Sequence, residues 1–338
     1  MDAILEYLSI VSNNIVRSFI NPNSFLSFWP LFLAGLLAFS VILWRLRQKS
    51  NWRGHKTSRK LKTLRRALLP KWLLTHPSSR MDVRIFVINH ALIFFSLFAA
   101  ILTPFIFAES FTTLMGSTGL AETKQTAAWG ERLAFTIIMV LAWDFAATYA
   151  HYLKHRIPMF WEFHKVHHSA DVMTPLTAMR RHPMETVLSV LVTGTVIGGA
   201  IAAWHLIVGH GVETLTIFGG LSGIYAWRLL GYNLRHSHIW VSYGQTWNRI
   251  LISPAQHQIH HSRDPKHHDT NFGHIFSFWD ALLGTLYLPE ETERVTFGID
   301  TDDADDFKTL QGVYLSPFVK SWAMLTRKFK WISNPAGR

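Results

Sequence analysis

The chain has 338 residues, 49% of them hydrophobic, with no cysteine and a formal net charge of +11. The lack of cysteine excludes disulfides, cysteine-ligated zinc and a built-in iron–sulfur centre, so nitrogen and oxygen must hold any metal. Most of the positive charge lies between Arg45 and Arg84, directly after an apolar segment, as in a cytoplasmic loop near anionic headgroups. Because this charge is not spread along a groove, we expect no nucleic-acid partner.

The apolar residues form long blocks, which favours one membrane-embedded body over two soluble domains. Residues 1–20 have a weak helical pattern and an acidic start, which predicts a surface helix rather than a cleaved signal peptide. Five later segments are long and apolar enough to cross about 30 Å of hydrocarbon, and the last two are expected to form a tight helical hairpin. They are 25–44, 85–108, 132–150, 186–208 and 213–232.

After the fifth segment, residues 245–300 predict a soluble helical cap with Gly, Pro and Asp punctuation. Residues 315–332 mix aromatic and basic side chains, which suits either an interfacial amphipathic helix or a solvated carboxy-terminal helix. If the basic loop is cytoplasmic, the third and fifth segments both end in the cytoplasm, near His151 and His236. The predicted fold is all-α: a multi-pass membrane helical bundle of about five spans, with a cytoplasmic helical cap that carries the histidine clusters.

Histidines recur in a fixed pattern at the edges of the apolar segments. His-x-x-His-His occurs at 164–168 and at 257–261, and His-x-x-x-His at 151–155. Residues at i, i+3 and i+4 share one face of a helix, and neutral imidazole is the commonest metal ligand. With His236 these patterns supply nine candidate ligands, enough for two metal ions with open positions: His151, His155, His164, His167, His168, His236, His257, His260 and His261. So many nitrogens favour a redox metal over zinc, which saturates at about four ligands.

Three further residues have two interpretations each. Asp144 lies within a predicted span, where it could orient a histidine from another helix or make a purely structural hydrogen bond. Asn233 could hold a metal-bound water or cap a helix end. For His182, which lies between Arg180 and Glu185, we favour a structural role over a place near the metals.

A longer set of motifs extends over roughly 140–290. In chain order it contains Asp144, Tyr149-Ala-His151, His155-Arg156, Trp161-x-x-His164-x-x-His167-His168-Ser169, Arg180-x-His182-Pro183-x-Glu185, His236-Ser237, Ser253-Pro254-x-x-His257-x-x-His260-His261-Ser262-Arg263-Asp264, Asp269-x-Asn271-Phe272-Gly273 and Trp279-Asp280-x-x-x-Gly284-Thr285. In order and spacing this set resembles the fatty acid hydroxylase/sterol desaturase superfamily of integral-membrane di-iron enzymes. Two positions depart from it: Tyr152 stands where the family often has Arg, and His238 where it often has Asn. His238 is therefore either an extra ligand or a surface residue.

The resemblance implies a non-haem di-iron oxidoreductase that uses O2 to oxidise an unactivated C–H bond of a membrane lipid. We expect a lipid hydroxylase, that is a monooxygenase, working with two Fe2+ ions; a lipid or sterol desaturase is the alternative. Fatty acyl, sterol and other lipid chains are all compatible substrates. The implied domains are the N-terminal spans with the basic loop, the hydroxylase-like catalytic domain and a C-terminal tail, at 1–130, 131–290 and 291–338.

The chain has no Gly-rich nucleotide fingerprint after a strand, so electrons are expected from a separate ferredoxin, cytochrome or reductase. A histidine-rich metal transporter is the alternative from another class of protein. It should place its ligands near the bilayer midplane, whereas these clusters lie at the ends of the predicted spans. With no C-terminal retrieval signal evident, a bacterial inner membrane is slightly favoured over the endoplasmic reticulum.

Overall fold

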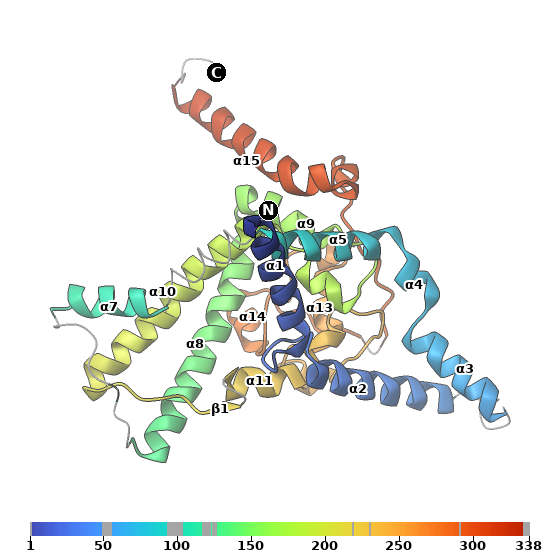
Figure 1. The fold of residues 1–338 in the computed structure, drawn as a ribbon, viewed down its shortest axis with the longest axis horizontal. Coiled ribbons are helices and arrows are strands. Elements are labelled where there is room, and N and C mark those ends of the chain that lie inside the picture. The colour runs from blue at the N-terminus through green and yellow to red at the C-terminus, as the bar shows by residue number, and fades with distance from the viewer. Residues whose placement is uncertain are drawn as a thin grey trace.

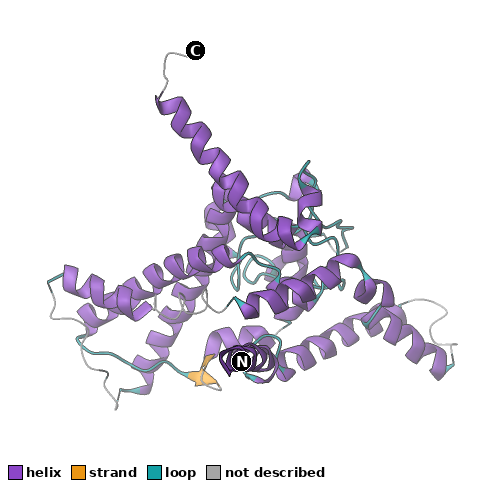
Figure 2. Ribbon diagram, turned by 45° about the horizontal axis from the view of Figure 1, so that its top comes forward, coloured by secondary structure: helices purple, strands orange, loops and turns teal. Residues whose placement is uncertain are grey.

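The computed structural model describes residues 2–48, 56–92, 104–116, 123, 127–217, 220–229, 231–290 and 292–333. These residues are mostly helical (Figures 1 and 2), which confirms the predicted helical class. The helices are α1 Asp2–Ile20, α2 Phe28–Arg47, α3 Thr57–Leu68, α4 Lys71–Thr75, α5 Pro77–Ala91, α7 Pro104–Leu114, α8 Trp129–Arg156, α9 Pro158–His168, α10 Pro183–Val208, α11 Ser222–Leu229, α12 Gly244–Trp247, α13 Pro254–His260, α14 Phe278–Leu283 and α15 Leu310–Ser333, with short 3-10 turns η1 Pro175–Met179, η2 Tyr232–Leu234, η3 Pro265–His267 and η4 Ala304–Lys308. Strands β1 Thr216–Ile217 and β2 Gly220–Leu221 form one antiparallel pair, with Thr216 opposite Leu221.

Three helices, α2, α8 and α10, are long and apolar enough to cross a membrane. They correspond to the first, third and fourth predicted spans. Helices α8 and α10 pack along one another, and α2 points away from that pair (Figures 1 and 2). The second predicted span, 85–108, begins in α5 and ends in α7, and its middle, 93–103, lies outside the described residues.

The fifth predicted span, 213–232, is not a single helix. Its described residues form an extended segment, the β1–β2 pair and the eight-residue helix α11. At 1.5 Å per residue, α11 is only about 12 Å long, far short of the hydrocarbon thickness. Glycines interrupt the helix here: Gly220 lies in β2, and Gly231 adopts a left-handed φ of 95°. The predicted helical hairpin after α10 is therefore wrong.

Small residues let α7 approach α10 very closely. A Cβ added to Gly194 would lie 2.5 Å from the ring of Phe107, and one added to Gly198 would lie 2.7 Å from the backbone oxygen of Pro104. This glycine pair, four residues apart on one helix face, is the usual small-residue contact of membrane helices. The opposite side of α10 remains free to face α8.

Proline and capping residues set the ends of the helices that carry the histidines. Pro158 ends α8 and begins α9 at its first position, because proline cannot continue a helix but suits a first turn. At α13, Ser253 accepts a hydrogen bond from the backbone N–H of Gln256, and Pro254 follows the cap. These local signals fix where each histidine-bearing turn begins.

Outside the spans, residues 245–300 contain the short helices α12, α13 and α14 joined by loops, so the predicted cap is only partly helical. At the C-terminal end, α15 packs on α9 through the rings of Phe163 and Phe318, 5.1 Å apart, and then extends away from the body (Figure 1). Residues 315–332 are thus helical, as expected. Trp322 is exposed on this helix, so either predicted environment remains compatible with it.

Candidate metal centre

All nine predicted ligand histidines come together in two adjacent groups. The five-histidine group contains His151, His155, His164, His168 and His260, and the four-histidine group contains His167, His236, His257 and His261. Within each group, one ring nitrogen of every member lies within 4.8 Å of the others. The groups touch where the rings of His168 and His261 stack, with centroids 4.4 Å apart.

Helical geometry explains how each His-x-x-His-His motif serves both groups. In α9, His164 and His168 belong to the five-histidine group, whereas His167 belongs to the other. Around α13 the division is reversed: the residues at i and i+4 belong to the four-histidine group and the residue at i+3 belongs to the five-histidine group. Adjacent helix residues point about 100° apart, because a turn holds 3.6 residues. Each motif therefore bridges two sites, and the pair in α8 completes the larger one.

The nitrogen spacings fit ligands of a common ion. The Nε2 atoms of His151 and His164 are 3.1 Å apart in the five-histidine group. In the four-histidine group, the Nε2 of His257 lies 3.0 Å from that of His236 and 3.2 Å from that of His261. Nitrogens bound to one ion at about 2.1 Å lie about 3.0 Å apart in octahedral geometry and about 3.4 Å apart in tetrahedral geometry.

Hydrogen bonds made by Nδ1 orient three rings of the five-histidine group. The Nδ1 of His164 contacts Glu185 at 2.7 Å, that of His151 contacts the Phe272 carbonyl at 3.0 Å, and that of His260 contacts the Thr270 carbonyl at 2.8 Å. A proton on each Nδ1 satisfies these acceptors and leaves Nε2 with a lone pair for a metal. Among the described residues, the buried Nε2 atoms of His155, His168 and His260 have no hydrogen-bond partner. Unpaired buried nitrogens that converge in this way are what a bound cation would satisfy.

The four-histidine group has a different surrounding. The buried guanidinium of Arg235 lies 2.9 Å from the Nδ1 of His257 and donates to the Gly273 carbonyl at 2.8 Å. A guanidinium can only donate, so this Nδ1 accepts, and a neutral ring then carries its proton on Nε2, the atom that faces His236. Ligation through that atom would release the proton. The two groups thus differ in charge as well as in ligand number.

Burial keeps these rings neutral. Desolvation is the largest cause in every case, and it lowers the pKa of His260 from 6.5 to about 4. It also lowers the pKa values well below the usual range for His164, His167, His168, His236, His257 and His261. A neutral imidazole is the form that binds metal, so the fold prepares the ligands at neutral pH.

Two separate cavities reach the histidines. The first, the metal-side cavity, has a volume of about 180 Å³ and is lined by members of both groups, together with Trp143, Lys154, Arg181 and Glu185. The second, the loop-side cavity, has a volume of about 350 Å³ and is lined by His155, His168 and His260 with charged groups that include Arg263 and Asp269. The site is therefore open towards the loops that contain Arg263 and Asp269 and towards the space between α8 and α10.

The four supporting residues considered from the sequence have structural partners. Asp144 accepts from the backbone N–H groups of Ile275 and Phe276 and from the Trp279 indole, so it holds a loop rather than a histidine. Asn233 donates to the Phe25 carbonyl at 2.6 Å.

His182 caps α10 by accepting from the Met184 N–H, and its Nε2 contacts the Tyr314 carbonyl at 3.2 Å. The Nε2 of His238 contacts the Ala67 carbonyl at 2.7 Å, which ties it to the end of α3. Neither ring belongs to the two histidine groups. His238 is thus neither an extra ligand nor a free surface residue.

Two residues that contact the ligands were not singled out for that role. Glu185, at the third position of α10, bonds the Nδ1 of His164 and pairs with buried Lys154 at 3.4 Å. Arg235 directly precedes His236 and contacts His257. Glu185 stands in the Arg-x-His-Pro-x-Glu motif and Arg235 beside a ligand, but only the tertiary fold shows which ring each one contacts.

This geometry defines a class: a helical protein with membrane-length apolar helices and a buried double site of nine imidazoles. A family model described as fatty acid hydroxylase matches residues 136–285, which contain every one of these histidines. Together with the curated relatives, this match supports the resemblance of the chain to the fatty acid hydroxylase/sterol desaturase superfamily.

The relatives include lipid oxygenases. The chain is 27% identical over 177 residues to the ornithine lipid hydroxylase OlsE of Rhizobium tropici, covering 52% of this chain and 49% of that protein. It is 24% identical over 185 residues to alkylglycerol monooxygenase of Caenorhabditis elegans, covering 55% of this chain and 32% of that protein. A third relative, the very-long-chain aldehyde decarbonylase GL1-1 of Oryza sativa subsp. indica, is 28% identical over 45% of this chain and 23% of its own length. The matches thus span half or less of each relative. No solved structure matches the chain.

Proposed function

We propose that this protein is a membrane-bound di-iron, oxygen-dependent lipid hydroxylase. The observation that carries the proposal is the pair of adjacent buried groups of neutral imidazoles, in which three Nε2 atoms of one group have no partner among the described residues. Nitrogen-only coordination with positions to spare suits a redox metal. The match of residues 136–285 to the fatty acid hydroxylase model, and the lipid hydroxylase and monooxygenase among the relatives, support the same chemistry.

Hydroxylation converts one C–H bond to C–OH and consumes O2, two electrons and two protons, with release of one water. When bound, two iron ions would supply the activation of O2 that no side chain offers. The five-histidine group would hold one ion and the four-histidine group the other. Glu185 would keep His164 in its ligating orientation, and burial of the rings would limit access of bulk water.

The two cavities favour separate routes for the reactants. The metal-side cavity lies between α8 and α10, helices of membrane-spanning length, so it is the route we assign to a lipid. The loop-side cavity at His155, His168 and His260 faces loops that carry Arg263 and Asp269, and we assign to that side the external electron donor. A metal transporter is less compatible, because the only ligands on a membrane-length helix, His151 and His155, lie at the end of α8 rather than at its middle.

The proposal is tested by comparing wild type with His260→Ala. The variant loses a ligand of the five-histidine group, so we expect it to contain less iron and to leave cellular lipids unmodified. His210→Ala is the matched control, since that ring lies beyond the far end of α10 and belongs to neither group. Iron is measured by elemental analysis of the purified protein, and lipids by mass spectrometry of cells that also express the native electron donor.

A lipid that gains one oxygen only with wild type and His210→Ala would support the hydroxylase. A lipid that instead loses two hydrogens would make the protein a desaturase with the same site. Unchanged lipid profiles, or a purified protein that contains zinc and no iron, would contradict the proposal.

A further inference from the structure

We propose that the tail of the lipid substrate lies in a seam between α8 and α10, and that Trp143 is the residue that determines how the tail is positioned. The proposal rests on the proposed function and adds the location of the tail. The seam is the line of contact between the two helices, from Phe135 and Ile201 at one end to His151 and Glu185 at the other.

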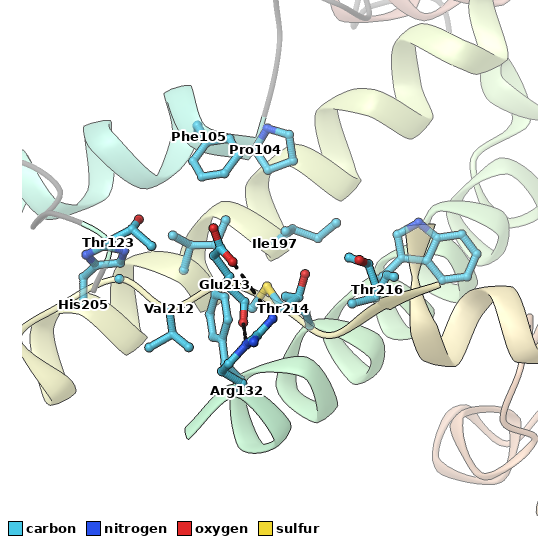
Figure 3. Close-up of a pocket in the computed structure, with 16 residues that line it drawn as sticks. Pro104, Phe105, Thr123, Arg132, Ile197, His205, Val212, Glu213, Thr214 and Thr216 are labelled. Atoms are coloured by element: carbon cyan, nitrogen blue, oxygen red, sulfur yellow. Dashed lines mark hydrogen bonds and ion pairs between the residues drawn. The ribbon is translucent and has the colours of Figure 1, made fainter. Parts of the chain in front are cut away.

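A further cavity, the seam cavity, lies along this seam beyond the metal-side cavity, and the two share one lining residue. The seam cavity has a volume of about 540 Å³ and lies among α7, α8, α10 and the segment before β1 (Figure 3). Its inner wall is apolar and includes Phe135, Met139 and Ile197. Trp143 lines both cavities and is the residue they share. The indole therefore stands at the boundary between the apolar space and the histidines.

Both helices present a continuous face along the route. On α8 the lining residues follow one another at steps of four: Phe135, Met139, Trp143, Ala147 and His151. On α10 the corresponding steps are Ile201, Ile197, Thr193, Ser189 and Glu185. Residues four apart lie above one another on a helix. At 1.5 Å per residue, the route from Phe135 to His151 is about 24 Å long, the scale of a long alkyl chain.

The residues that line the route indicate which end of the lipid lies near the histidines. Between Phe135 and Trp143 the side chains of α8 and α10 that line the route are apolar, so an alkyl chain there stays out of water. The outer rim of the seam cavity carries the Arg132–Glu213 ion pair. The part nearest the histidines contains Ser189, Thr193, Lys154 and Arg181. A polar or anionic head near these cations, with the tail along the seam, places the carbons closest to the head beside the histidine groups.

Two other apolar cavities are less suited to this role. One, of about 410 Å³ between α9, α10 and α15, meets the metal-side cavity only at Lys154 and Glu185. That pair holds His164, so a tail crossing there would disturb a ligand. The other, of about 530 Å³ beneath α2, shares no lining residue with the metal-side cavity.

The position of Trp143 is fixed by the ring of His274, which also lines the metal-side cavity. Its indole stacks on His274, with centroids 5.4 Å apart and planes 6° from parallel. The backbone of the same loop is held by Asp144 at Ile275 and Phe276. A ring with so little freedom limits the width of the passage, which is why we assign it control over the tail.

The test is photo-crosslinking of purified full-length protein in phosphatidylcholine vesicles that contain palmitic acid with a diazirine at its terminal carbon. Labelled peptides are identified by mass spectrometry, with no need for turnover. We expect the label on seam-lining residues of α8 and α10. Ile197→Trp fills the seam cavity and should lose that labelling. Ile207→Trp makes the same change on α10 at a side chain that is 83% exposed, and should keep it.

Labelling confined to exposed faces, or seam labelling that survives in Ile197→Trp, would overturn the seam assignment. Iron content of both variants reports on folding of the histidine site, which lies several turns away. The outcomes also separate the two proposals. Seam labelling without any lipid oxidation would contradict the proposed function and leave the seam assignment intact. Lipid oxidation that continues unchanged in Ile197→Trp would contradict the seam assignment and leave the proposed function intact.

Discussion

At the level of single residues, the two histidine groups differ in the partners of the Nδ1 atoms of their ligands. In the five-histidine group, backbone carbonyls and the Glu185 carboxylate accept hydrogen bonds from the Nδ1–H groups and make the rings better donors to a metal. In the four-histidine group, the Arg235 guanidinium donates to the Nδ1 of His257 and withdraws electron density from that ring. Two ions bound here would therefore have different affinities, with the tighter one in the five-histidine group.

Glu185 offers a direct test of this difference. Glu185→Gln keeps the shape of the side chain but removes the charge that the His164 Nδ1–H meets at 2.7 Å. Loss of such an outer partner typically weakens metal affinity by about 10- to 100-fold. We expect one ion to be lost at low free iron while the other stays, as measured by titration with a chelator. Lys154→Met is the control, since it removes the other partner of Glu185 and leaves its bond to His164 intact; equal iron loss in both variants would argue against the orienting role.

His182 gives a pH-dependent contribution to stability. Burial lowers its pKa from 6.5 to about 4, and a proton on Nδ1 would break the cap to Met184. Between these values the unfolded chain binds more protons than the folded one, so the free energy of unfolding falls as pH falls from about 6.5 towards 4. A shift of this size corresponds to roughly 3 kcal/mol. His182→Asn keeps a capping side chain that does not titrate.

We therefore expect the melting temperature of His182→Asn to fall less steeply with acid than that of wild type. The measurement is thermal unfolding of the purified protein in detergent between neutral and mildly acidic pH. Parallel curves for the two proteins would show that another group carries the acid sensitivity.

At the level of elements, the sequence predicts the features that depend on local residue spacing and composition. Eight of the nine ligands follow from i, i+3 and i+4 spacing, and α2, α8 and α10 follow from long apolar runs. His236 stands outside these patterns. The division of the ligands into five and four does not follow from spacing alone, because it depends on how α9 and α13 face each other. The segment 213–232 is apolar enough for a span, but its glycines and the partly buried Arg228 favour a hairpin and a short helix instead.

Gly198 is the residue of α10 at which the backbone of α7 comes closest. A Cβ at Gly198 would lie 2.7 Å from the Pro104 oxygen and 2.9 Å from the Ala108 nitrogen, both backbone atoms that cannot rotate away. Gly198→Ala should therefore push the helices apart and destabilise the protein by about 1–3 kcal/mol. Gly199→Ala is the neighbouring control, because its nearest contact is 3.9 Å away, and its better helix propensity should make it neutral or stabilising. Thermal unfolding of the two variants measures the difference; equal melting temperatures would contradict the packing.

At the scale of the whole molecule, the basic loop and the histidine-bearing segments pack together. Buried Asp82, in α5, pairs with Arg180 at 3.1 Å, and Ser78 accepts from the backbone N–H of Asp171. Helix α3 is tied to the same body through the Ala67 carbonyl and His238. The strongly basic stretch therefore lies on the same side as the ends of α8 and α10 that carry the site. Positive charge favours the cytoplasm, so the site is predicted to face the cytoplasm as well.

The absence of native cysteine allows this orientation to be tested with single introduced cysteines. Lys71→Cys lies in the basic stretch, Lys266→Cys lies near the histidines with its side chain 59% exposed, and Glu213→Cys lies beyond the far end of α10 at 71% exposure. A membrane-impermeant maleimide should label Glu213→Cys in intact cells and the other two only after permeabilisation. The opposite pattern would reverse the orientation. Labelling of Glu213→Cys and Lys266→Cys from the same side would show that α10 does not cross the membrane, and the lipid tail would then reach the site from the surface instead of through the seam.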